Sequence, residues 1–186
     1  APTMKPTTPE EARKGVQTHK ALKVDFIKIW MGDKGFSPEI IAAIVDEAKK
    51  QNIPITAHIG NVAQVKQLAD LGVTDFMHEA RDGMNPEFIA YAKAKGLSFV
   101  PTLGQGQSRW YYYEHPEFLT MDAKFDGFYA RGRAMLNDAA RKQEIIGAPD
   151  FETTRQRFKE NNYPFIKMMS DAGIRVVTGS DCGAGA

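Results

Sequence analysis

The sequence has 186 residues but only one cysteine, Cys182, so it cannot form an internal disulfide bond. It lacks an excess of charge of either sign, because 24 lysines and arginines face 23 aspartates and glutamates. This balance gives no electrostatic reason to expect nucleic acid or an anionic membrane as the main partner. Apolar runs of transmembrane length are also missing. What remains is the composition of an ordinary globular protein.

Short apolar segments alternate with amphipathic segments along the chain, which predicts strands separated by helices. Helices are expected to begin after four residues of the types that cap helices, and three of these are followed by proline and glutamate. The caps are Thr8, Ser37, Asn61 and Asn85. The predicted strands are 24–30, 54–59, 75–80, 97–103 and 175–181. This alternation predicts right-handed βαβ units and a parallel sheet, and no composition shift suggests a second domain.

A long segment separates the last two predicted strands. Its final part, 151–172, reads as the helix that precedes the fifth strand. Its first part, 104–150, is rich in aromatic residues, among them the run Tyr111, Tyr112 and Tyr113. A loop of this length in a compact domain is usually functional, often as a lid. We therefore expect one domain over 1–186 with an inserted loop or lid at 104–150.

Four of the predicted strands carry an ionisable side chain near the carboxyl end: Lys28, His58, His78 and Asp181. In a parallel barrel these ends surround one mouth, where active sites form. Imidazole and carboxylate groups are ligands of divalent metal ions. The lysine is unexpected in the apolar strand VDFIKIW, because a bare ammonium is costly to bury. Reaction with carbon dioxide would turn it into a carbamate, an anion whose two oxygens could bridge two cations.

Each residue also has a purely structural interpretation. Lys28 could extend its charged end to solvent, and either histidine alone could be a satisfied core residue. Asp181 in GSDCGAG could be a turn or helix-cap aspartate. The agreement of all four strand ends favours a metal site over these separate explanations.

The motifs VDFIKIW, TAHI, FMHEA and TGSDCGAG, in this order, resemble strands four, five, six and eight of the amidohydrolase superfamily. The resemblance is greatest to its imidazolonepropionase-related, prolidase-like branch. It implies an α/β fold, a (β/α)₈ TIM barrel, present here in part as about strands four to eight. It also implies two divalent metal ions, usually zinc, with Lys28 carboxylated and bridging them. By the same resemblance, His58 and His78 bind the second ion and Asp181 the first.

The resemblance further implies a hydrolase that attacks an amide carbonyl with a metal-bridging hydroxide, with Asp181 as general acid and base. Its substrates would be small molecules such as dipeptides, as in prolidase. Arg81 could bind a substrate carboxylate, and Tyr112 and His115 are weaker candidates for substrate contacts. One alternative is a cyclic-amide hydrolase like imidazolonepropionase with a single metal ion, although that branch lacks the bridging lysine. Another is a catalytically incomplete barrel fragment that serves only in assembly.

This chain departs from the family pattern in one respect that affects the metal site. The family's first strand carries a His-x-His pair, and this sequence has none; its other histidines are His19 and His115. A full barrel needs about 250 residues. We therefore expect the missing N-terminal strands to come from a parent polypeptide or a partner chain. The sequence leaves open whether the protein forms a homo-oligomer and in which compartment it works.

Overall fold

The computed structural model describes residues 3–31, 35–80, 82, 85–108, 110–117, 132 and 134–181. The chain divides into two compact units. The sheet unit comprises Ala1–Pro101 and Phe165–Gly179, and the second unit comprises Thr102–Pro164 and Ser180–Ala186.

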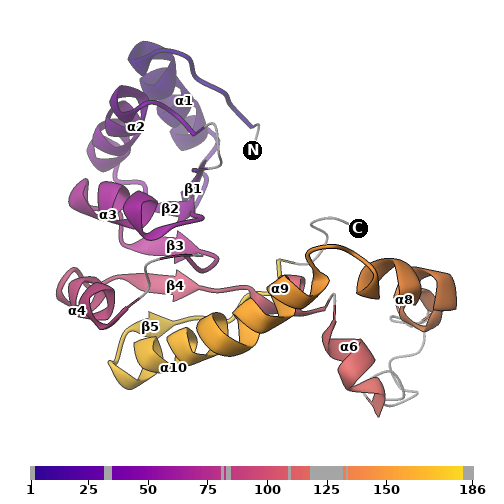
Figure 1. The fold of residues 1–186 in the computed structure, drawn as a ribbon. Helices are drawn as coiled ribbons and strands as arrows, with labels where there is room; N and C mark the ends of the chain where they lie inside the picture. Colours follow the sequence, from indigo (N-terminus) through magenta and orange to yellow (C-terminus); the bar gives the residue numbers. More distant parts are fainter. Residues whose placement is uncertain are drawn as a thin grey trace. The chain divides into compact units, whose positions relative to one another are not determined.

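The sheet unit contains a five-stranded parallel sheet whose strands lie side by side in sequence order (Figure 1). The strands are β1 (Ile27–Trp30), β2 (Ile55–His58), β3 (Asp75–Met77), β4 (Ser98–Val100) and β5 (Arg175–Val176). Each strand pairs in parallel with the next. The predicted succession of βαβ units is therefore confirmed. All five strands are shorter than predicted.

Helices alternate with the strands in the predicted rhythm. They are α1 (Pro9–Ala21), α2 (Pro38–Lys50), α3 (Val62–Asp70), α4 (Pro86–Ala94) and α10 (Tyr163–Asp171), of which α10 joins this unit from Phe165 onward. Each of the four predicted caps accepts a hydrogen bond from a backbone N–H in the first turn of its helix. Side-chain caps of this kind satisfy donors that the helix itself leaves unpaired, which is why the sequence fixes these starts so well.

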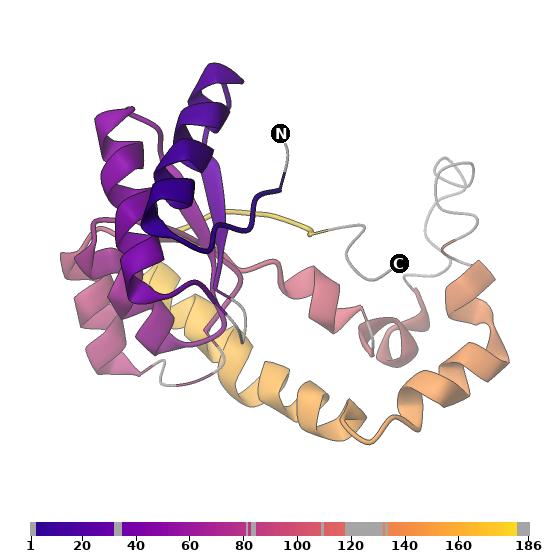
Figure 2. The ribbon, with the colours of Figure 1, turned by 90° about the horizontal axis from the view of Figure 1, so that it is seen from above.

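The core lies on the face of the sheet that α1 to α4 cover (Figures 1 and 2). One row of side chains crosses this face in register from β1 to β4, and all of its members are buried: Ile29, Ala57, Phe76 and Phe99. They belong to one apolar cluster with helix residues such as Ile41, Leu68 and Phe88. Burial of this apolar row is what holds the strands in register.

The opposite side of the sheet, here called the inner face, carries a polar row in register: Lys28, Thr56, Asp75, Ser98 and Arg175. The sequence predicts Lys28 in a buried strand, but its side chain is exposed. The reason is that β1 is one edge of the described sheet, with a strand on one side only. Two aromatic neighbours, Phe26 and Trp30, are 51% and 67% exposed for the same reason.

The second unit is helical in its described residues, with α5 (Leu103–Gln107), α6 (Tyr111–Glu114), α8 (Ala139–Ile146) and α9 (Phe151–Arg157). The helix predicted over 151–172 is not continuous, because a π-helical turn, η3 (Phe158–Asn162), separates α9 from α10. Pro164 explains the interruption. It has no N–H for the carbonyl of Glu160, and its ring crowds that carbonyl, so regular α-helical bonding is lost there.

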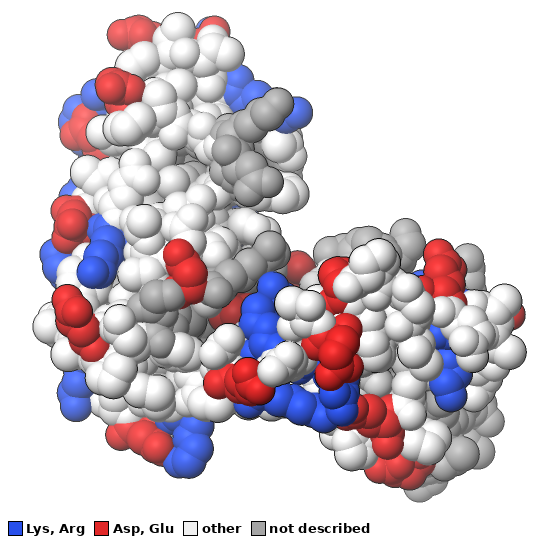
Figure 3. All heavy atoms as spheres, in the orientation of Figure 1, with Lys and Arg blue, Asp and Glu red and all other residues white. Residues whose placement is uncertain are grey.

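Basic and acidic side chains are interspersed on the face of the molecule in Figure 3, as the balanced composition predicts. Among the described residues, no helix combines the length and the apolar character that a bilayer crossing requires.

Candidate metal centre

Two of the predicted ligands lie side by side at the carboxyl ends of neighbouring strands. His58 is the last residue of β2, and His78 directly follows β3. Their ring centroids are 4.3 Å apart, with the rings inclined by 63°. Both residues are partly buried. Two imidazoles at this separation, on rigid strand ends, form half of a typical zinc ligand set.

His78 reaches this position through an unusual backbone conformation. Strand alternation predicts that it shares a face with Phe76, but Phe76 points into the helix-covered core. The alternation ends at Met77, because His78 adopts a left-handed backbone with φ of 72°. Its N–H donates to the carbonyl oxygen of Val100 at 2.8 Å, which fixes the turn against β4.

Asp181 also has a left-handed backbone, with φ of 51°. Such conformations cost a non-glycine residue on the order of 1–3 kcal/mol and cluster at functional sites. Among the described non-glycine residues, the others with positive φ are Lys23, Asn52 and Thr102. Lys23 and Asn52 follow helix ends, where this conformation is ordinary. His78 instead directly follows β3, and Thr102 lies two residues beyond the end of β4.

Lys28 lies on the same face of the sheet as His58, one step nearer the amino ends of the strands. Its register partner on β2 is Thr56, whereas Trp30 is opposite His58. The Trp30 ring lies 5.0 Å from the His58 ring, centroid to centroid, at 32°. Sequence reasoning did not assign Trp30 to the site, although the same alternation that groups it with Lys28 could have done so.

The remaining predicted site residues lie elsewhere in the chain. Arg81 lies outside the described residues. Asp181, Tyr112 and His115 belong to the second unit, so their approach to His58 stays a prediction. His115 Nδ1 is 3.0 Å from Glu117 Oε1, and its ring is 4.4 Å from that of Tyr111. Tyr112 is partly buried, with its ring centroid 6.3 Å from that of Tyr111.

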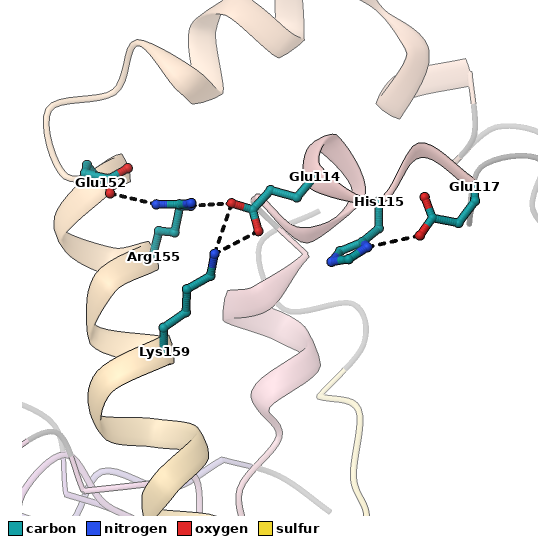
Figure 4. A network of polar contacts seen from close by, with 6 residues as sticks. All are labelled: Glu114, His115, Glu117, Glu152, Arg155 and Lys159. Atoms are coloured by element: carbon teal, nitrogen blue, oxygen red, sulfur yellow. Dashed lines mark hydrogen bonds and ion pairs between the residues drawn. The ribbon is translucent and has the colours of Figure 1, made fainter.

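A charged network in the second unit links α6 to α9 and η3 (Figure 4). The Glu114 carboxylate accepts hydrogen bonds from Arg155 Nε and from Lys159 Nζ, the latter at 3.1 Å to Oε2. Burial raises the pKa of Glu114, but the hydrogen bonds from Arg155 and Lys159 outweigh it, so this pKa lies below its ordinary value. Arg155 also donates to Glu152 at 2.8 Å. This network is structural, since it joins helices and leaves Glu114 saturated with donors.

The side chains present fit a metal ion in part. Among the described residues, no three or more of His, Cys, Asp and Glu gather as a ligand set. The His58–His78 pair supplies two nitrogen donors, and a carbamate on Lys28 would add oxygen donors from the same face. A buried hydroxyl beside Lys28, Thr56 Oγ1, has no hydrogen-bond partner among the described residues. This unsatisfied group is what a site whose ligand is missing would leave behind.

The model of the amidohydrolase family matches residues 6–186, so the chain belongs to this family. The chain resembles solved structures of a Xaa-Pro dipeptidase with bound methionine (18% identity, TM-score 0.59) and a prolidase complexed with N-methylphosphonate-L-proline (18%, 0.58). It also resembles an ochratoxinase of A. niger (19%, 0.56). No curated protein matches it.

The similarity covers 96%, 93% and 92% of this chain but 39%, 38% and 34% of the respective matched chains. The chain therefore spans well under half the length of the structures it resembles. Its five parallel strands are part of the (β/α)₈ barrel of amidohydrolase type, as the sequence predicts.

Proposed function

We propose that this chain forms part of the active site of a metal-dependent hydrolase that cleaves amide bonds in small substrates. The observation that carries the proposal is the pair His58 and His78, whose rings lie 4.3 Å apart at adjacent strand ends. Membership of the amidohydrolase family supports the reaction class. The left-handed backbone of His78 also supports a functional role. This conformation is costly for a histidine, and His78 is not a member of the buried apolar cluster that could otherwise explain it.

Each residue has a distinct task in this proposal. His58 and His78 would hold one divalent ion, Asp181 would hold a second, and a carboxylated Lys28 would supply oxygen donors to both. Two bound ions, of which zinc suits the donor set, would polarise the scissile carbonyl and make hydroxide available near neutral pH. Asp181 accepts a proton as the attack begins and transfers it to the nitrogen of the leaving amine.

The modification of Lys28 needs only carbon dioxide. The neutral Nζ attacks the carbon atom of CO₂, forming an N–C bond while one C–O π pair moves onto oxygen. One proton then leaves Nζ for solvent, which gives a carbamate with one negative charge. Bound cations would hold the product against the reverse reaction.

The substrate class follows from the resemblance to prolidases. A Xaa-Pro dipeptidase and a prolidase with a proline phosphonate share this fold, which makes dipeptides the first substrates to test. Arg81 is proposed to bind the substrate carboxylate, with Tyr112 and His115 as further contacts from the second unit.

Barrel strands outside this chain are proposed to complete the site. The edge strand β1 and helix α1 border a groove of about 380 Å³, lined by apolar side chains such as Val16, Phe26 and Trp30. A preceding strand and helix of the same barrel, from the parent polypeptide or a partner chain, would fill this groove. Such elements would cover Phe26 and Trp30, whose exposure is otherwise unfavourable.

Metal analysis of the protein in its natural length tests the proposal. We expect two ions per site, loss of metal in His58→Ala and in His78→Ala, and loss of activity in Lys28→Ala with partial rescue by short carboxylic acids. His19→Ala is the matched control, because His19 lies on α1 and its Nδ1 is 2.9 Å from the carbonyl oxygen of Gly15. Unchanged metal content in both strand-end variants would show that His58 and His78 are structural residues of the core and not metal ligands.

A further inference from the structure

Thr56 presents an unusual polar group on the inner face of the sheet. It is 5% exposed, and its Oγ1 has no hydrogen-bond partner among the described residues. Within the described part of the sheet unit, Thr56 Oγ1 is the one buried side-chain polar atom without a hydrogen-bond partner. The other such atoms belong to the second unit. A buried hydroxyl without a partner is destabilising, so its presence calls for an explanation.

The neighbours of Thr56 in the polar row indicate where its hydroxyl can find a partner. On one side is Asp75, whose carboxylate accepts hydrogen bonds from Ser98 Oγ and from Thr74 Oγ1 but not from Thr56. On the other side is Lys28, the register partner of Thr56 on β1. In the strand register, Thr56 therefore lies between a carboxylate to which it does not donate and the lysine that the proposed function carboxylates.

We infer that Thr56 is a positioning residue whose hydroxyl donates a hydrogen bond to the carbamate on Lys28. This inference rests on the proposed function. An ammonium group offers only donors, whereas a carbamate offers two anionic oxygens, to which a threonine hydroxyl can donate. Such a hydrogen bond would restrict the rotation of the carbamate on the same face of the sheet as His58, which is the next inward-facing residue of β2.

The test compares Thr56→Val, which keeps the shape but removes the hydroxyl, with Thr56→Ser, which keeps the hydroxyl. In the natural-length protein without metal and bicarbonate, Thr56→Val should be at least as resistant to thermal unfolding as the wild type, because it removes an unsatisfied buried group. With zinc present, the bicarbonate concentration for half-maximal metal uptake should rise at least about tenfold in Thr56→Val, the scale of a hydrogen bond to a charged group. Thr56→Ser should restore the wild-type value.

Ser98→Ala is the matched control. Ser98 is 4% exposed on the same face, but its hydroxyl already donates to Asp75. Its removal should lower stability equally with and without bicarbonate, and should leave the bicarbonate dependence of metal uptake unchanged.

The outcomes separate this inference from the proposed function. If Lys28→Ala takes up metal with the same bicarbonate dependence as the wild type, Lys28 is not the carboxylated group, and Thr56 cannot have the role inferred here. If Lys28→Ala abolishes that dependence while Thr56→Val leaves it unchanged, only the role of Thr56 is overturned. A loss of metal-free stability in Thr56→Val would also overturn it, since the hydroxyl would then have a partner in the empty site.

Discussion

The sheet unit and the second unit are stabilised by different kinds of contact. The sheet unit buries an apolar row across four strands and packs it under helices, whereas the described part of the second unit buries only two apolar side chains, Trp110 and Phe158. Instead, Glu114 joins its helices through charged partners (Figure 4). Apolar packing responds little to salt and pH, while charged contacts respond to both. The strand-end histidines therefore stand on strands that are held by apolar packing, which is the kind of contact less sensitive to salt and pH.

The largest effect should come from the apolar row. Phe76 is fully buried and stacks on Phe99, with ring centroids 5.5 Å apart. Phe76→Ala should lower the free energy of unfolding by about 3–5 kcal/mol, because it removes apolar contacts and leaves a cavity. Chemical denaturation of the natural-length protein would measure this. Phe76→Leu, which keeps most of the volume, should cost clearly less, and equal losses in the two variants would contradict the packing explanation.

An intermediate effect is expected in the second unit, where Gly106 of α5 lies against a buried ring. A Cβ atom at Gly106 would come within 2.6 Å of Phe158 Cζ. Gly106→Ala should therefore destabilise the protein by about 1–3 kcal/mol through overpacking. Gly104 is the matched control in the same helix, since a Cβ there meets nothing within 4 Å. Gly104→Ala should be neutral or stabilising because alanine favours helix, and equal thermal shifts in the two variants would refute the close approach.

The smallest effect should come from the charged network. Glu114→Gln should cost on the order of 1 kcal/mol, because the side chain is 29% exposed and the ion pairs are partly screened. Hydrogen exchange of the amides in α6 and α9 would report the loss. Glu152→Gln is the matched control, since Glu152 contacts the same arginine but is 69% exposed, and it should change little.

The lowered pKa of Glu114 predicts how the stability of the second unit changes with pH. The pKa of Glu114 is below its ordinary value in the folded protein, so its contribution is fully present above the ordinary glutamate pKa near 4.5. That contribution is lost as the pH falls through the lower folded value. Acid should therefore loosen the contact of α6 with α9, and Glu114→Gln should remove this part of the pH dependence. Acid-induced exchange in α6 and α9 that is the same in Glu114→Gln as in the wild type would contradict this assignment.

Much of the sheet unit could be predicted from sequence, because its signals are local. A cap such as Ser37 followed by proline and glutamate fixes a helix start wherever it occurs, and the alternation of apolar side chains assigns Ile29 and Lys28 to opposite faces. The π-helical turn could have been predicted as well, because Pro164 lies inside the segment 151–172, and a proline in a helix interior disrupts regular bonding. The alternation rule also misplaced His78, since it holds only while the backbone stays extended.

By itself, the sequence determined which residues could form strands and helices and which of them carry metal-binding chemistry, because periodicity, caps and side-chain type are properties of short segments. Only the tertiary structure decided that His58 and His78 meet, that Lys28 lies exposed at the edge of the described sheet, and that the Thr56 hydroxyl has no hydrogen-bond partner among the described residues. These facts depend on strand register and on a left-handed turn after β3, and both are fixed by packing between segments far apart in the chain.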